Sequence, residues 1–251
     1  MKNQIWKKGS FLKKEDLIIS CPKCQKSNLK LEKFKNFITE NGNQLEKHGY
    51  PYGIEHLFLG ILKCLNESCK EIVSISGFVE KDIENIEIDH NNEYQQNCFD
   101  YFTPNYFYPN IKYFKLNEQI PENIRNVINL AFHHYFYDLN ACANKIRTSI
   151  ELILDDIKAP KKKRNKNGEL KKINNLHNRI EHFSKKNKTL AIHMLANKYI
   201  GNDGSHINNV KREDVLLALD NLEEIINIIY IKKNQNLISK SKKLINSREN
   251  N

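Results

Sequence analysis

The chain has 251 residues, 39% of them hydrophobic and 10% aromatic, a composition that excludes a disordered protein and allows one or two domains. No apolar run of about 18 residues and no signal-peptide pattern occur, so we expect a cytoplasmic protein without a membrane partner. The formal net charge of +10 favours an acidic partner such as RNA or DNA, although an AT-rich genome also produces a lysine-rich, arginine-poor composition.

Residues 1–77 place two close cysteine pairs between short apolar runs that favour β-strands. The pairs are Cys21-x2-Cys24 and Cys64-x4-Cys69. The expected strands are residues 17–19, 57–62 and 72–75. The segment between the pairs, residues 26–56, is rich in Lys and Asn. We expect this segment to be a loop insertion with a short helix near residues 31–38.

Two cysteine turns together provide the ligand set of a structural zinc ion, which binds four thiolates tetrahedrally. A redox Cys-x2-Cys motif is one alternative, but it requires a following helix and leaves the second pair without a role. Chance is the other alternative. We therefore predict a Zn²⁺ cofactor in a zinc-ribbon-like module, bound by Cys21, Cys24, Cys64 and Cys69. The separate residues Cys98 and Cys142 are typical of ordinary buried thiols.

Residues 78–120 form an aromatic-rich segment without helical periodicity. Its rings include Tyr101, Phe102, Tyr106, Phe107 and Tyr108. We expect an extended aromatic connector that packs as a strap over a neighbouring core. The alternative is that free aromatic rings in this segment stack against nucleic-acid bases.

Residues 121–240 show the apolar period of helices. Pro121 is typical of a helix start, and Gly201 is expected to end a helix as a C-cap. The apolar faces cover residues 124–135, 143–157, 173–183, 190–201 and 215–229. The polar residues after Lys232 are expected to fray, with residues 241–251 as a polar tail. The predicted fold class is α+β, predominantly α: a small zinc-ribbon-like β module followed by an antiparallel bundle of about five helices.

A basic loop joins the second and third predicted helices. Its cations include Lys161, Lys162, Lys163, Arg164 and Lys166. One interpretation is a flexible arm that contacts nucleic-acid phosphates. The alternative is a solvated loop in a lysine-rich chain. The positive charge of this run is denser than the average of the chain, and both interpretations stay open.

A second candidate site combines polar residues from two predicted helices. Arg147 and Glu151 are four residues apart and face each other on one helix, and Lys198 lies on an otherwise apolar helix face. Together with Asn202 and His206 of a Gly-Asn-x3-His turn, they can form one polar pocket. The alternative is structural, because a Gly-Asn pair suits left-handed backbone and the histidine can bond a helix end.

Three stretches of the helical section occur in a characteristic order. They are a helix-opening proline segment at residues 121–124, an alanine-rich Arg-x3-Glu helix at residues 141–151, and a Gly-Asn-x3-His turn at residues 198–206. In this order they resemble the domain-of-unknown-function 4145 family, in which cysteine pairs ahead of the domain also recur. The resemblance covers residues 100–230 and the two cysteine turns.

The resemblance implies a helical domain similar to the higher eukaryotes and prokaryotes nucleotide-binding (HEPN) superfamily. Such domains are often attached to restriction-modification and phage-defence machinery. HEPN ribonucleases use an Arg-x4-6-His motif without metal, in which the His acts as acid and base and the Arg holds the phosphate. This sequence has Gly201 where an Arg would precede Asn202, and the nearest upstream cation is Lys198.

We therefore expect a non-catalytic zinc-binding accessory or interaction protein that contacts nucleic acid, as part of a phage-defence or restriction system with a defence-system protein as partner. The alternative is an enzyme, a HEPN-type metal-independent ribonuclease that uses His206. A third class is a structural module that forms a homo-oligomer.

Overall fold

The computed structural model describes residues 4–12, 17–48, 56–88, 94–165, 167–205, 210–231 and 233–249. Contacts divide the chain into two compact units. The first unit comprises residues 1–115 and 129–142, and the second comprises residues 116–128 and 143–251. An α+β fold, with most strands before residue 110 and most helices after residue 120, is confirmed.

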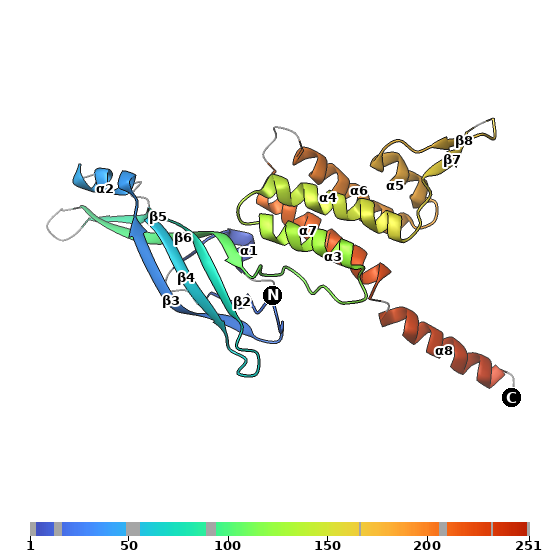
Figure 1. Cartoon of the computed structure of the whole chain (residues 1–251), viewed down its shortest axis with the longest axis horizontal. Coiled ribbons are helices and arrows are strands. Elements are labelled where there is room, and N and C mark those ends of the chain that lie inside the picture. The colour runs from blue at the N-terminus through green and yellow to red at the C-terminus, as the bar shows by residue number, and fades with distance from the viewer. Residues whose placement is uncertain are drawn as a thin grey trace. The chain divides into compact units, whose positions relative to one another are not determined.

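The first unit is built on a six-stranded antiparallel sheet (Figure 1). The spatial order of the strands is β1-β6-β5-β4-β3-β2. The strands are β1 (Phe11–Leu12), β2 (Ile19–Ser20), β3 (Asn28–Ile38), β4 (His56–Cys64), β5 (Ile72–Ile88) and β6 (Tyr94–Tyr108). Two short helices accompany them, α1 (Gln4–Lys8) before the sheet and α2 (Glu40–Lys47) between β3 and β4. This sheet is larger than the small zinc ribbon expected.

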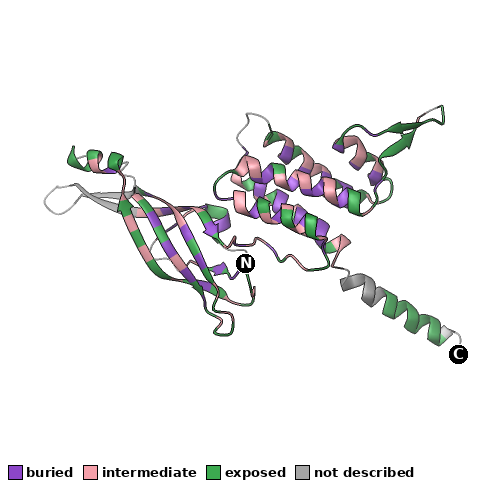
Figure 2. Ribbon diagram, viewed as in Figure 1, coloured by how far each residue is buried: buried purple, intermediate pink, exposed green. Residues whose placement is uncertain are grey.

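One face of this sheet carries the core of the first unit. Successive strand residues point to opposite faces, and in β4 Phe58 and Leu62 are fully buried while Leu57 and Leu59 are exposed (Figure 2). The ring of Phe58 stacks on Phe34 at 5.3 Å between ring centroids. Burying a side chain of this size stabilises the fold by about 1.5–3 kcal/mol.

A second aromatic cluster of the first unit surrounds Trp6 of α1, which is 2% exposed. Its ring centroid lies 4.6 Å from that of Tyr135 and 4.9 Å from that of Phe136. The Tyr135 hydroxyl donates a hydrogen bond to the Trp6 carbonyl oxygen. This bond satisfies a polar group that would otherwise be buried without a partner.

The helix expected near residues 31–38 is wrong, because this stretch lies in strand β3. Burial alternates along it on either side of a bulge between Leu31 and Lys33, so Leu29 and Phe34 face the core while Lys30 and Lys35 are exposed. Alternation with period two stabilises a half-buried strand once β4 supplies the hydrogen-bond partner. The register pairs Leu29 with Cys64 and Phe37 with Leu57.

The aromatic-rich segment expected to be a connector supplies the end of β5 and all of β6. In β6 the rings alternate, since Phe102 and Phe107 are buried whereas Tyr106 and Tyr108 are 42% and 77% exposed. The buried rings join the core, and the exposed tyrosines remain on the outer face of the sheet.

The expected helices form close to their predicted positions. They are α3 (Glu122–His134), α4 (Leu139–Asp156), α5 (Leu176–Ser184), α6 (Lys188–Asp203) and α7 (Arg212–Ile229). The residues expected to fray after Lys232 form a further helix, α8 (Lys233–Glu249). No helix in the described part of the chain is long and apolar enough to cross a membrane.

In the second unit, helix α6 packs against α5 and α7. Two asparagines cap helix starts, because the Asn175 side chain accepts a hydrogen bond from the Asn178 amide and the Asn187 side chain accepts one from the Leu190 amide. Helix α7 buries an apolar stripe that includes Val215, Leu219, Leu222 and Ile226.

Candidate functional site

The four cysteines predicted to bind metal meet at one end of the sheet. Cys21 and Cys24 lie in the turn between β2 and β3, while Cys64 ends β4 and Cys69 lies in the turn before β5. Strand β3 connects the two turns, because Leu29 pairs with Ile19 on one side and with Cys64 on the other. All four Sγ atoms lie within 4.8 Å of one another.

Two of the six distances between the sulfur atoms match those of a tetrahedral metal centre. The Sγ atoms of Cys21 and Cys69 are 3.8 Å apart, and those of Cys24 and Cys64 are 3.7 Å apart. Metal–sulfur bonds of about 2.3 Å in a tetrahedron require sulfur atoms about 3.8 Å apart. A disulfide requires about 2.05 Å. The arrangement therefore fits four thiolate ligands around one metal ion.

The backbone of both turns is shaped in the same way. The residue after the second cysteine of each turn has a positive φ, 50° at Gln25 and 52° at Lys70. In the first turn the Gln25 amide donates a hydrogen bond to the Cys21 carbonyl oxygen, and in the second the Lys70 amide donates one to the Asn66 carbonyl oxygen. Left-handed backbone at a residue other than glycine costs free energy of about 1–2 kcal/mol. Two such positions beside one cluster indicate a constrained ligand geometry.

The protonation preferences of the thiols differ across the cluster. A backbone hydrogen bond from Lys26 lowers the pKa of Cys24 to about 6. Burial raises the pKa of Cys64 to about 12 and also raises the pKa of Cys21. The positive charge of a bound metal would reverse this burial effect and deprotonate the thiols. Four protein ligands also leave no open coordination position, as is typical of structural sites.

Of the two other cysteines, Cys142 lies outside this cluster. Cys142 is fully buried, and burial raises its pKa, which confirms an ordinary buried thiol. The Cys98 side chain lies outside the described residues.

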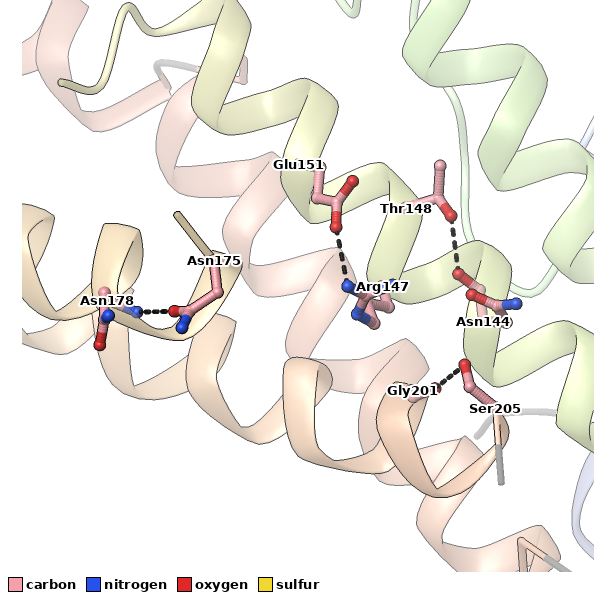
Figure 3. Close-up of polar contacts among 8 residues, drawn as sticks. All are labelled: Asn144, Arg147, Thr148, Glu151, Asn175, Asn178, Gly201 and Ser205. Carbon is pink, nitrogen blue, oxygen red and sulfur yellow. Dashed lines mark hydrogen bonds and ion pairs between the residues drawn. The ribbon is translucent and has the colours of Figure 1, made fainter. Parts of the chain in front are cut away.

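Part of the second candidate site is brought together where α4 and α6 meet in the second unit. An Nη2 atom of Arg147 lies 3.1 Å from Oε1 of Glu151 (Figure 3). Gly201 lies directly against this arginine, since a Cβ on Gly201 would collide with the Arg147 Cβ and would be 2.9 Å from the Ala143 carbonyl oxygen.

The other predicted members of this site are placed less closely. The Nζ of Lys198 lies 4.1 Å from the centre of the Tyr199 ring, and Asn202 is a half-buried residue of α6. His206 lies outside the described residues. The catalytic assignment of the five residues stays a prediction.

The C-cap expected at Gly201 is wrong, and so is left-handed backbone at Gly201 and Asn202, which was part of the structural alternative. Both residues are helical, and α6 continues to Asp203 with Gly204 as its C-cap. Glycine stands at position 201 because α4 passes too close for a side chain, not because the backbone turns there. The Ser205 hydroxyl donates a hydrogen bond to the Gly201 carbonyl oxygen at 3.1 Å (Figure 3).

One buried polar residue of α6 was missed in the sequence. Asn197 is fully buried, and neither polar atom of its side chain has a hydrogen-bond partner within the described residues. It shares the buried face of α6 with Met194 and Gly201. The spacing of three and four residues from these neighbours is the signal that predicts its burial.

The predicted basic loop is a two-stranded hairpin of β7 (Lys162–Arg164) and β8 (Leu170–Lys172). All six strand residues are exposed. Lysines lie directly opposite each other, Lys162 against Lys172 and Lys163 against Lys171. Of the other residues predicted to contact nucleic acid, Lys161 lies 2.9 Å from the Asp155 carboxylate. The Arg164 guanidinium donates a hydrogen bond to the Gly168 carbonyl oxygen. Lys166 lies outside the described residues.

Comparison with known families divides the chain in two. Residues 9–107, which include the four cysteines, match the family model described as Domain of unknown function (DUF8608). Residues 129–248 match the model described as Domain of unknown function (DUF4145). No curated protein and no solved structure matches the chain.

Proposed function

Because residues 129–248 match the DUF4145 family, as the sequence resemblance predicted, and follow a four-cysteine centre in the chain, we propose that the protein is a zinc-binding accessory protein that contacts nucleic acid. The family resemblance extends this proposal to a role in phage defence or restriction, with a defence-system protein as partner. Its site would recognise phosphate charge and would not perform chemistry.

Zinc is the metal that the cysteine centre supports best. Four thiolates in tetrahedral arrangement suit Zn²⁺ or an iron–sulfur site, and the sulfur separations of 3.7 and 3.8 Å fit a single ion. The four cysteines come from two turns that β3 brings together. Bound zinc would therefore hold the end of the sheet in place and contribute free energy of folding.

The observation that supports nucleic-acid contact is the like-charge pairing in the β7–β8 hairpin. Lysines directly opposite each other destabilise a strand pair, yet Lys162 and Lys163 face Lys172 and Lys171. No acidic side chain of the described residues forms an ion pair with these four lysines. Phosphates of a bound nucleic acid would relieve the repulsion and release counterions.

A binding titration tests the nucleic-acid part of the proposal. Fluorescence anisotropy with labelled single-stranded and duplex oligonucleotides should detect binding at low salt. The logarithm of the affinity should fall linearly with the logarithm of the salt concentration, because each neutralised phosphate releases counterions. A protein that binds neither oligonucleotide at low salt would contradict the proposal.

A metal-independent ribonuclease is the second candidate, and the contact between Arg147 and Gly201 favours it. That contact joins two of the three stretches that carry the family resemblance, residues 141–151 and 198–206. The test is cleavage of single-stranded RNA in the presence of a chelator. If the wild type cleaves the RNA and both His206→Ala and Lys198→Ala lose this activity, the protein is a ribonuclease and not an accessory protein. We expect no cleavage, because the guanidinium fork that would hold the phosphate beside Asn202 is replaced by Gly201.

A further inference from the structure

The outer face of the sheet in the first unit carries apolar and aromatic side chains among its polar ones. Strand pairing aligns residues of β3, β4, β5 and β6 on one face. The aligned rows are Lys33–Ile61–Ser74–Tyr108, Lys35–Leu59–Ser76–Tyr106 and Phe37–Leu57–Phe78–Thr103. We call these three rows the outer platform.

Exposure on the outer platform is high for apolar residues of central strands. Leu57 and Leu59 of β4 are 53% and 54% exposed, and Phe37 of β3 is 41% exposed. An antiparallel sheet with one wet face normally alternates apolar residues inside with polar residues outside. A contiguous apolar surface of this kind marks a binding site.

Two tyrosines of the outer platform present rings suited to stacking. Tyr106 and Tyr108 are two residues apart on β6, about 6.6 Å along the strand, and both are exposed. The Tyr106 ring is already stacked on Tyr137, with 5.0 Å between ring centroids and 27° between ring planes. Every nucleic-acid base has a π-face, so such rings bind bases with little regard to sequence.

Positive charge lies on the β3 side of the outer platform. Lys33 and Lys35 begin two of its rows, and neither forms an ion pair within the described residues. The Nζ of Lys35 lies 4.9 Å from the centre of the Phe37 ring. These cations and the tyrosines therefore offer a phosphate contact and a base contact in the same rows.

A cleft continues from the tyrosine side of the outer platform. It has a volume of about 490 Å³ and is lined by Tyr108, Pro22, Lys23, Glu71, Pro109, Asn110, Lys112 and Asn129. Lys23 is neutralised by Glu71 at 3.0 Å, whereas Lys112 has no ion pair within the described part of the chain. The volume lies within the range of small-ligand pockets, and the Lys112 ammonium suits the phosphate of one nucleotide. The Asn110 side chain already bonds Asn129 and His133.

We propose that the outer platform and this cleft bind single-stranded RNA or DNA, with bases stacked on Tyr106 and Tyr108 and phosphates held by Lys33, Lys35 and Lys112. The proposal rests on the proposed nucleic-acid association and names its substrate class. A duplex does not fit, because its bases are already stacked and expose no π-face to a flat protein surface. The β7–β8 hairpin, which has no aromatic residue, contacts phosphates of either form.

The test is the affinity of the full, metal-loaded protein for a labelled oligothymidine or oligouridine. Tyr106→Ala and Tyr108→Ala should each weaken binding by roughly tenfold, because each removes one base stack. Tyr108→Phe should keep the affinity, since the ring remains. Tyr199→Ala, which removes an exposed ring of the second unit, is the matched control and should change nothing. Melting temperatures of all variants check that they fold.

The outcomes separate this inference from the proposed function. The outer platform would not be the nucleic-acid site if a Tyr106→Ala/Tyr108→Ala double variant kept its oligonucleotide affinity while neutralising the β7–β8 hairpin abolished binding. The proposed function would then remain intact. A wild type that binds no nucleic acid would overturn both. A wild-type dimer that dissociates on Leu59→Lys, without a change in oligonucleotide affinity, would assign the outer platform to a second copy of the chain.

Discussion

Single residues decide how closely neighbouring elements approach in this protein. A Cβ on Gly77 would collide with the Thr103 carbonyl oxygen and would lie 2.7 Å from the Pro104 Cα, where β5 and β6 change register. Gly201 has the same role between α4 and α6. In both places atoms of the neighbouring element fill the space that a side chain would need, backbone atoms of β6 at Gly77 and the Arg147 Cβ with the Ala143 carbonyl oxygen at Gly201. Glycine is therefore required by packing and not by a turn.

Gly201→Ala should destabilise the second unit. Alanine has a helix propensity about 1 kcal/mol better than glycine, but its Cβ would collide with the Arg147 Cβ and the Ala143 carbonyl oxygen. Such overpacking typically costs about 1–3 kcal/mol, so the net effect should be a loss of stability and a melting temperature lower by a few degrees. Thermal unfolding measures it.

Gly204→Ala is the control for this substitution. Gly204 is the C-cap of α6 with φ of −65°, a conformation that alanine adopts without strain. It should leave the melting temperature nearly unchanged. Equal stability of Gly201→Ala and the wild type would show that α4 and α6 can separate at no cost, contrary to their close packing.

At the scale of elements, the strand that pairs with a segment decided the secondary structure of that segment as much as its own sequence did. Residues 28–38 of the lysine-rich insertion form strand β3 because β2 and β4 pair on either side. The run of lysines after Pro160 forms a hairpin and not a loop. The hairpin is stabilised by its turn, where the Asn165 side chain accepts hydrogen bonds from the Asn167 and Glu169 amides. The hairpin holds its lysines in a defined array.

Neutralising the β7–β8 hairpin should weaken nucleic-acid binding. A Lys162→Gln/Lys163→Gln/Lys171→Gln variant keeps Arg164, which bonds the Gly168 carbonyl oxygen, and removes like-charge repulsion, so the hairpin should still form. Affinity should fall, and the slope of log affinity against log salt should decrease by about 0.7–0.9 for each phosphate that is no longer neutralised. Titrations at several salt concentrations measure the slope.

The matched control removes the same charge from another exposed element. Lys240, Lys242 and Lys243 of α8 are exposed, and their replacement by Gln should leave the salt slope close to that of the wild type. If both triple variants lose affinity equally, overall charge and not the hairpin governs binding.

At the scale of the whole molecule, each unit has its own means of stabilisation. The second unit buries apolar helix faces, as α7 does with Val215, Leu219 and Leu222. The first unit combines an aromatic core with a four-cysteine centre that joins two distant turns. Since the turns are about 40 residues apart in sequence, cross-linking them with a metal restricts the unfolded chain considerably.

Purified protein should contain about one zinc atom per chain, and removal of the metal should lower its melting temperature by about 10 °C or more, because structural zinc contributes directly to folding. Elemental analysis and thermal unfolding before and after chelation measure both. Cys69→Ser should lose the metal, whereas Cys142→Ala, which changes a buried thiol outside the centre, should keep it. Metal-free protein of undiminished stability would contradict the prediction, and iron in place of zinc would change the metal assignment.

The sequence by itself determined the residue set of the four-cysteine cluster and the positions of the helices from α3 to α7. Ligand chemistry depends on residue type and spacing, so Cys21, Cys24, Cys64 and Cys69 could be recognised without coordinates. Helix α7 could be recognised because its apolar period is local and long. The resemblance to the DUF4145 family could also be recognised from local patterns, because it rests on short motifs in a fixed order.

Only the tertiary structure decided which of these residues meet. The register of β3 against β4 brings the two cysteine turns together, and the crossing of α4 and α6 turned Gly201 from an expected helix end into a packing position. Strand pairing also decided that Tyr106 and Tyr108 share a face with Leu59 and Lys35. Such contacts join residues distant in the chain, and their free energy comes from burial and pairing that no local pattern encodes.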